Sequence, residues 1–216
     1  MLIEFLGIPG VGKSSISRLV ATKLQGRGYR VNEMTYDLDH YRKTIMRRLI
    51  KSFRIGSSIW NIPSASLAGF SAVAATQQAT PSDFVKCTSN WVYIASLLSR
   101  QRKPTTINIL DQGIAQAIWS VGLEAQRDDW LDLTLDGARP LLQRVDLVVH
   151  VSADIDVVKE RLLSRSVRAS RAEAYVHQID AIQRAVRHCR AIEERLTATG
   201  MMVVKVENRI PEQLET

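Results

Sequence analysis

Short apolar runs alternate along the chain with longer stretches in which apolar residues recur at helical spacing. The clearest run is Val145 to Val151 (VDLVVHV), and Leu2 to Leu6 is another that Gly7 and Pro9 end. Short apolar runs bounded by turn residues indicate buried strands. The pattern predicts five strands, at residues 2–6, 29–36, 105–110, 145–151 and 201–206.

The segments between these strands are predicted to be mainly helical. From Ser14 to Gly26, for example, Ile16, Val20 and Leu24 recur every four residues, which places them on one helix face. A break is predicted at Thr80-Pro81, with a new helix start near Asp83. The other predicted helices lie at 39–51, within 67–102, from 113 to about 142 with an interruption near Gly137 and Pro140, at 154–171 and at 172–197, and residues 56–66 are turn-rich.

Strands that alternate with helices predict an α/β fold. Parallel strands require a crossover connection, which is usually a helix. The helical block at about 40–103 is an addition between the second and third strands. A length of 216 residues without repeats or linkers fits one domain, 1–216.

Composition excludes several classes of protein. Hydrophobic residues make up 45% and charged residues 24%, which is typical of globular proteins. Cys87 and Cys189 lie too far apart for a metal-ligand pair, which argues against a disulfide scaffold or zinc ribbon and favours a reducing, cytoplasmic location. No apolar run approaches the roughly 20 residues of a membrane span. Glu4 interrupts the first apolar run, so a signal peptide is not expected.

The segment from Gly7 to Ser14 (GIPGVGKS) matches the phosphate-loop pattern G-x-x-x-x-G-K-[ST]. It follows a predicted strand and opens a predicted helix, which is the context that the pattern requires. Backbone amides of such a loop and the positive end of the helix dipole bind phosphate groups. Lys13 is expected to reach the β- and γ-phosphates and the Ser14 hydroxyl to hold Mg²⁺. The candidate nucleotide-binding residues here are Gly7, Pro9, Gly10, Val11, Gly12, Lys13, Ser14 and Ser15.

Carboxylates follow the second and third predicted strands. Because ligands gather at the carboxyl ends of parallel strands, these side chains are expected beside the phosphate loop. Asp111 is the candidate Mg²⁺ partner, with a helix cap as the alternative. Asp37 or Asp39 is the candidate acceptor of a proton from an attacking hydroxyl, with a solvated turn as the alternative.

Four arginines lie within eleven residues after the fourth strand: Arg161, Arg165, Arg168 and Arg171. Their spacing keeps them on roughly one face of a helix, where guanidinium groups could stabilise a γ-phosphoryl group in transfer. The alternative is a solvated basic helix face.

The formal charge of +7 calls for an anionic partner. No aromatic residues accompany these arginines, which argues against nucleic acid. Because the basic segments 42–51 and 161–171 are expected to flank the phosphate loop, nucleotide phosphates are favoured over nucleic acid or a membrane surface.

Taken together, Gly7 to Ser14, Asp111-Gln112-Gly113 and Arg161 to Arg165 resemble the nucleoside and nucleotide kinases, such as thymidylate kinase and deoxynucleoside kinase. The resemblance implies a three-layer P-loop NTPase fold with sheet order 2-3-1-4-5 and an arginine-bearing lid at about 161–172. It carries catalytic roles onto Lys13, Asp111, Arg161 and Arg165, to which the arginine pattern adds Arg168. It also places the loop that contains Asn208 near the adenine ring, and it makes a homodimer a further expectation.

These observations predict an ATP- and Mg²⁺-dependent phosphotransferase that acts on a small acceptor, a nucleoside or nucleotide first. The alternatives are a kinase of a non-nucleotide small molecule and a regulatory P-loop ATPase or GTPase. Gln112 stands where the resembling kinases have an arginine, so a phosphate contact to the acceptor is missing. A neutral acceptor is favoured, or one recognised by arginines elsewhere, with Arg42 or Arg47 as candidates. Candidate walls of the acceptor pocket are Trp60, Phe70, Gln77, Gln78, Trp91, Tyr93, Gln116 and Trp119, with an ordinary helical core as the alternative.

Overall fold

The computed structural model describes residues 1–34, 63–99, 105–164 and 179–209 of the chain. Its five strands form one sheet in the order β2-β3-β1-β4-β5, and every neighbouring pair is parallel. The predicted order 2-3-1-4-5 is therefore confirmed. The strands are β1 (Leu2–Leu6), β2 (Arg30–Glu33), β3 (Thr106–Leu110), β4 (Leu147–Ser152) and β5 (Val203–Glu207).

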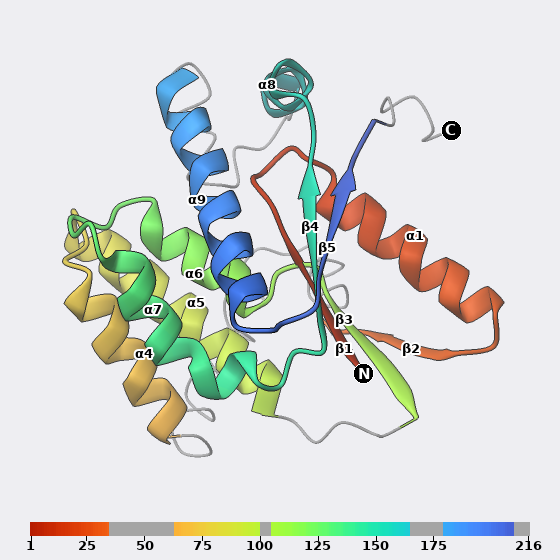
Figure 1. Cartoon of the computed structure of the whole chain (residues 1–216), viewed down its shortest axis with the longest axis horizontal. Helices are drawn as coiled ribbons and strands as arrows, with labels where there is room; N and C mark the ends of the chain where they lie inside the picture. The colour runs from red at the N-terminus through yellow and green to blue at the C-terminus, as the bar shows by residue number, and fades with distance from the viewer. Residues whose placement is uncertain (35–62, 100–104, 165–178, 210–216) are drawn as a thin grey trace.

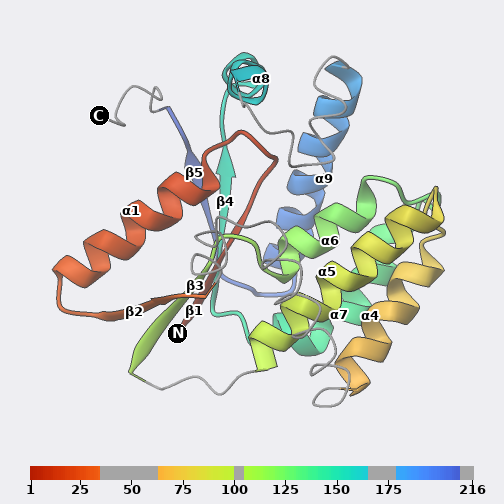
Figure 2. The same ribbon diagram turned by 180° about the vertical axis from the view of Figure 1, so that it is seen from behind.

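Helices cover both faces of the sheet, which gives three layers (Figures 1 and 2). Helix α1 lies on one face, α6 and α9 lie on the other, and α4, α5 and α7 pack outside α6. Helix α8 lies beyond the carboxyl end of β4. The helices are α1 (Lys13–Gly26), α4 (Pro63–Ala75), α5 (Pro81–Ser99), α6 (Ile114–Gly122), α7 (Trp130–Leu142), α8 (Ile155–Ser164) and α9 (Ile179–Ala198).

The central strands are buried, as a sheet with helices on both faces requires. All five residues of β1 are buried, and so are four of the six in β4. The edge strands β2 and β5 mix exposed and half-buried positions. In the part of the chain that the structure describes, no helix combines the length and apolar character needed to cross a membrane.

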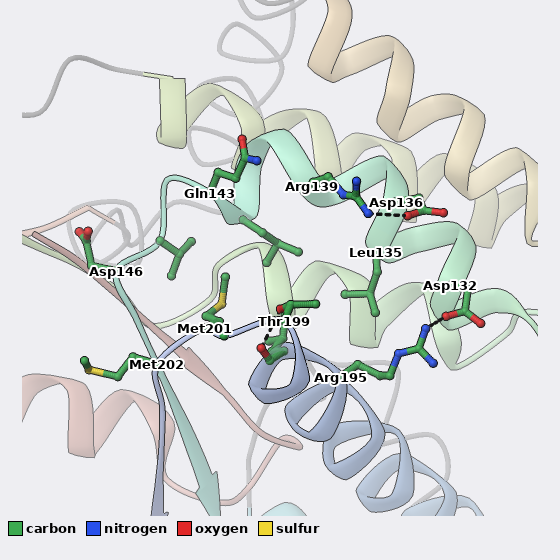
Figure 3. Close-up of a pocket in the computed structure, with 14 residues that line it drawn as sticks. Asp132, Leu135, Asp136, Arg139, Gln143, Asp146, Arg195, Thr199, Met201 and Met202 are labelled. Atoms are coloured by element: carbon green, nitrogen blue, oxygen red, sulfur yellow. Dashed lines mark hydrogen bonds and ion pairs between the residues drawn. The ribbon is translucent and has the colours of Figure 1, made fainter.

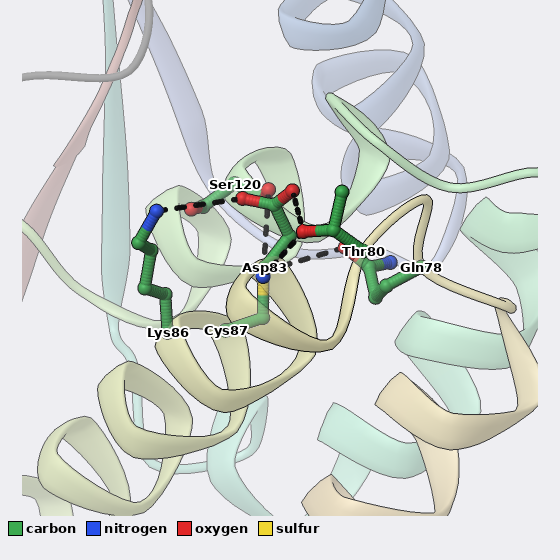
Figure 4. A network of polar contacts seen from close by, with 6 residues as sticks. All are labelled: Gln78, Thr80, Asp83, Lys86, Cys87 and Ser120. Atoms are coloured by element: carbon green, nitrogen blue, oxygen red, sulfur yellow. Dashed lines mark hydrogen bonds and ion pairs between the residues drawn. The ribbon is translucent and has the colours of Figure 1, made fainter.

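The start of α5 confirms the predicted break at Thr80-Pro81 (Figure 4). The Thr80 hydroxyl donates to Asp83 Oδ2 at 2.6 Å, and the Asp83 amide donates to Thr80 Oγ1 at 3.1 Å. This reciprocal pair satisfies a free helix amide and fixes where the helix begins. One turn later the buried Cys87 thiol lies 3.5 Å from Gln78 Oε1 and 3.6 Å from the Ser120 carbonyl, so it links α5 to α6.

The interruption predicted near Gly137 and Pro140 is wrong. Helix α7 continues through both residues, and the break lies instead at residues 123–129. A Cβ at Gly137 would lie 2.6 Å from the Ala72 Cβ, so this glycine allows α7 to approach α4 closely. Pro140 is exposed in the last turn of α7, where it removes a single helical hydrogen bond.

Several strand boundaries also differ from the prediction, and β2 ends at Glu33, before the predicted end at residue 36. Strand β4 begins two residues after Val145, because the Val145 amide donates to Leu142 in a turn at 2.9 Å. Strand β5 likewise begins after Met201, whose amide donates to the Leu196 carbonyl at the end of α9. Tyr29 belongs to the turn after α1 through a bond to the Leu24 carbonyl.

Helix α4 begins at Pro63, inside the stretch predicted to be turn-rich. Helix α9 begins at Ile179. The helix predicted at 39–51 and most of the lid predicted at about 161–172 lie outside the described residues.

Candidate active site

The phosphate loop connects the carboxyl end of β1 to α1, as predicted. Gly10 and Gly12 have φ angles of 91° and 86°, a left-handed conformation that favours glycine. Gly12 immediately precedes α1, whose first turn carries no acidic residue, and no described side chain caps it. The first amides of α1 are therefore oriented to bind an anion.

Lys13 folds back over this loop. Its Nζ donates to the Gly7 carbonyl at 2.7 Å and to the Ile8 carbonyl at 3.1 Å. The carbonyls at the start of the loop thus hold the ammonium group against the loop. Together the charge and the amides form an electropositive site for phosphate oxygens.

Ser14 and Asp111 meet beside the loop, although they are 97 residues apart in sequence. The Ser14 hydroxyl donates to Asp111 Oδ2 at 3.1 Å. Both groups are oxygen donors, which Mg²⁺ prefers, and Mg²⁺ takes its remaining ligands from phosphates and water. The described residues hold no group of three or more His, Cys, Asp or Glu side chains suited to a metal. The pair therefore fits an ion that shares its ligands with a nucleotide.

Two further predicted residues support the loop from behind. Arg161 of α8 is buried, and its Nη1 donates to the Gly10 carbonyl at 3.4 Å. Asn208, which follows β5, is also buried, and its Nδ2 donates to the Val11 carbonyl at 2.8 Å. A Cβ at Gly12 would lie 2.2 Å from Asn208 Nδ2, so this contact requires glycine in the loop. A catalytic role for Arg161 and a nucleotide contact for Asn208 stay predictions.

The remaining predicted loop residues differ in exposure. Val11 is buried against Gly7, Pro9 is half-buried, and Ser15 is exposed at the start of α1. The predicted proton acceptor Asp37, its alternative Asp39, and the arginines Arg165, Arg168 and Arg171 lie outside the described residues.

A buried glutamate behind the loop is a residue that sequence reasoning missed. Glu4 lies in the middle of β1 with no exposed surface, and it accepts hydrogen bonds from the amides of Ile114 at 2.8 Å and Ala115 at 2.9 Å. Burial raises the pKa of Glu4 to about 7, although these two bonds act in the opposite direction. A lone charge within an apolar strand is the sequence signal that could have identified it.

Gln116, predicted as a wall of the acceptor pocket, instead contacts the phosphate loop. It is buried in the first turn of α6, and its Oε1 accepts a hydrogen bond from the Gly7 amide at 3.2 Å. This bond joins α6 directly to the first residue of the loop.

Most of the other predicted pocket residues belong to the core. Trp91, Tyr93 and Trp119 are buried, and Trp119 Nε1 donates to the Ala185 carbonyl at 2.9 Å. Gln78 Nε2 donates to Thr76 Oγ1 and to the Val121 carbonyl. Phe70 and Gln77 are exposed, and Trp60 lies outside the described residues. Burial favours the helical-core interpretation for Trp91, Tyr93 and Trp119, and its hydrogen bonds favour it for Gln78.

A cavity of about 800 Å³ lies away from the phosphate loop, next to the amino ends of β4 and β5 (Figure 3). Ion pairs join Asp132 to Arg195 and Asp136 to Arg139 along its wall. Because ligands of parallel α/β sheets bind at the opposite, carboxyl edge, this cavity is not the predicted site.

Comparison with known proteins supports the fold. No protein-family model matches the chain, and no curated protein matches it in sequence. The structure of deoxyadenosine kinase from M. mycoides with bound dATP matches with a TM-score of 0.51 and 11% identity, over 98% of this chain and 93% of that chain. The structure of the same kinase with dCMP and dCDP has a TM-score of 0.48 at 13% identity, over 98% of this chain and 92% of that chain. The structure with dCTP has a TM-score of 0.47 at 14% identity, over 99% of this chain and 93% of that chain. The chain therefore has a P-loop NTPase fold like that of deoxynucleoside kinases.

Proposed function

We propose that this protein is an ATP- and Mg²⁺-dependent kinase that transfers the γ-phosphoryl group to a small acceptor, with a nucleoside as the first candidate. One observation carries the proposal: the Ser14 hydroxyl and the Asp111 carboxylate lie 3.1 Å apart beside the phosphate loop. A hydroxyl from the loop and a carboxylate from a neighbouring strand end are the protein ligands that a P-loop site supplies to Mg²⁺.

Each described residue has a physical task in this proposal. The amides at the start of α1 bind phosphate oxygens, and Lys13 adds a positive charge at the same place. Mg²⁺, when bound, neutralises charge that develops on the phosphates. Arg161 and Asn208 hold the back of the loop so that its amides are arranged before the nucleotide binds.

Three residues outside the described part of the chain complete the proposal. Asp37 is the candidate that accepts the proton of the attacking hydroxyl. Arg165 and Arg168 are the candidates that stabilise the transferred phosphoryl group.

The acceptor is proposed to be neutral. Gln112 follows Asp111 at the end of β3 and is exposed, and an amide cannot form the charge-assisted pair that an arginine makes with a phosphate. The fold shared with a deoxyadenosine kinase supports a nucleoside as the first acceptor to test.

The test is release of ADP from MgATP in the presence of nucleosides, nucleoside monophosphates and sugars. At least one acceptor should raise the rate above that measured without acceptor. Lys13→Met should lower this rate by about 10²–10³-fold, the usual effect of removing a group that stabilises transition-state charge. Lys23→Met is the matched control, because Lys23 lies in the last turn of the same helix and is exposed.

The alternatives predict different outcomes. A sugar or other non-nucleotide acceptor that raises ADP release would make the protein a kinase of that compound. Hydrolysis that no acceptor accelerates would contradict the kinase proposal and favour a regulatory ATPase. Replacing ATP with GTP in the same assay identifies the donor.

A further inference from the structure

We propose that Glu4 is a positioning residue for the phosphate loop. Its buried carboxylate binds the first amides of α6 and so holds this helix against β1. Gln116 of α6 in turn binds the amide of Gly7, the first residue of the loop. The inference rests on the proposed function for its effect on activity. Its structural part, the link from β1 through α6 to the loop, is testable without any turnover.

The contacts of Glu4 are specific to the beginning of α6. Each carboxylate oxygen accepts one amide, Oε2 from Ile114 and Oε1 from Ala115. The first amides of a helix have no partner within the helix. A carboxylate there also interacts favourably with the helix dipole. Glu4 therefore fixes the position of α6 relative to the central strand.

The space for this carboxylate depends on Gly113. A Cβ at Gly113 would lie 1.9 Å from Glu4 Oε2, which is far inside contact distance. The φ and ψ angles of Gly113, −110° and −156°, are extended and open to other residues. The close approach of Glu4, rather than backbone conformation, is thus what requires glycine at this position.

Two contacts link α6 and the residues just before it to the nucleotide site. Gln116, one residue after the second amide that Glu4 binds, accepts the Gly7 amide at 3.2 Å. Asp111, two residues before Gly113, accepts the Ser14 hydroxyl. The first residue of the phosphate loop therefore contacts α6 directly, and its last residue contacts Asp111, three residues before the first amide that Glu4 binds.

The described elements next to Glu4 carry few charged groups. Helix α6 has no charged residue, and the partners of Glu4 on the neighbouring strands are Leu110 and Val148. His150, two positions further along β4, pairs with Glu193 of α9, which also pairs with Lys205 of β5. Because burial raises the pKa of Glu4 to about 7, the experiment is best done at about pH 8, where the carboxylate is ionised.

The test combines hydrogen exchange with nucleotide binding in Glu4→Gln. A glutamine amide presents one acceptor and one donor to two amide donors, so one hydrogen bond is lost at nearly unchanged volume. Exchange of the amides at 114–115 should become about 10-fold faster, and the Kd for MgATP should rise about 10-fold, as expected for the loss of one charge-assisted hydrogen bond.

Gly113→Ala tests the same contact from the other side, should Glu4→Gln not fold. The added Cβ displaces the carboxylate, so both effects should recur. Gln116→Met separates the two steps, because it removes only the acceptor for Gly7. It should weaken MgATP binding while leaving exchange at 114–115 unchanged.

Asp146→Asn is the matched control. Asp146 Oδ2 accepts a hydrogen bond from the backbone amide of Leu2, the first residue of β1. Like Glu4→Gln, this change replaces a hydrogen-bonded carboxylate with a side-chain amide, but at the end of β1 that lies away from the phosphate loop. It should leave MgATP affinity unchanged. Unaltered exchange at 114–115 in both Glu4→Gln and Gly113→Ala, or an equal loss of affinity in Asp146→Asn, would overturn the inference. If the unmodified protein binds no nucleotide, the proposed function fails, whereas the exchange data still decide the role of Glu4.

Discussion

The candidate active site is formed by side chains that the fold brings together from distant parts of the sequence. Ser14 and Asp111 form one polar contact beside the phosphate loop. Glu4 and Gln116 form a second layer of contacts behind it. Ser14 is exposed and Asp111 is half-buried, whereas Glu4 and Gln116 are buried.

Asp111→Asn should weaken the response to Mg²⁺. The substitution keeps an oxygen at the site but removes its charge, and a carboxylate is the stronger ligand for a hard cation. We expect the Mg²⁺ concentration for half-maximal turnover to rise about 10–100-fold. Asp136→Asn, on the exposed face of α7, is the control. An unchanged Mg²⁺ titration in Asp111→Asn would exclude this carboxylate as part of the metal site.

Glu4 should make stability depend on pH. Its pKa is about 7 in the folded protein and 4.5 for the ordinary carboxyl group, so the folded state binds an additional proton between these values. The stability that Glu4 contributes is complete below about pH 4.5 and is lost as the pH rises through 7, by roughly 3 kcal/mol in total.

Denaturant unfolding of the wild type and Glu4→Gln at pH 5 and pH 8 measures this term. The advantage of the wild type over the variant should be smaller at pH 8. An advantage that grows as the pH rises would show that the two amide bonds outweigh burial in setting the pKa.

At the residue scale, the sequence could predict residues whose type and spacing follow directly from chemistry. The phosphate loop needs its glycines, lysine and serine at fixed positions, and Asp111 could be predicted because it follows an apolar strand. Glu4 stands out as a lone charge within an apolar strand, but the sequence does not predict which amides it binds. The contacts of Glu4 and Gln116 depend on the packing of α6 on β1, which no local pattern describes.

At the element scale, contacts between elements override the local sequence signals that predict where helices and strands begin and end. Gly137 lies in the middle of α7, where glycine disfavours a helix, yet it marks no break because it faces Ala72 of α4. The predicted strand starts at Val145 and Met201 are also wrong, because local hydrogen bonds override the apolar pattern. Both residues are apolar, but their amides bond to the preceding helix or turn.

Gly137→Ala should destabilise the protein. Its Cβ would lie 2.6 Å from the Ala72 Cβ, so α4 and α7 must separate, at a cost of about 1–3 kcal/mol in the free energy of unfolding. Gly26→Ala is the matched control, since nothing lies within 4 Å of a Cβ at the last residue of α1. That change should be neutral or stabilising by about 0.5 kcal/mol. Equal effects of the two substitutions in thermal unfolding would contradict the packing role of Gly137.

At the scale of the whole molecule, the sheet order explains why the site forms where it does. Strands β1 and β3 are parallel neighbours, so the phosphate loop and Asp111 lie side by side at the carboxyl ends of these two strands. The sequence predicted this order only through resemblance to known kinases, since alternating strands and helices are compatible with several orders. The cavity of about 800 Å³ lies at the opposite edge. A homodimer and a cytoplasmic location stay predictions.

The charge of +7 is consistent with a protein that binds phosphates. Within the described residues, Lys13 and Arg161 place part of this charge at the phosphate loop, where each donates to a loop carbonyl. Such fixed charges attract anionic ligands and raise their association rates.

The most direct test of the kinase proposal is to follow the fate of the γ-phosphoryl group. Mass spectrometry of reactions with MgATP and the nucleoside panel detects both ADP and any phosphorylated acceptor. The proposal predicts one phosphorylated acceptor for each ADP formed, with almost none in Lys13→Met. Accumulation of ADP and inorganic phosphate with every acceptor unchanged would contradict it.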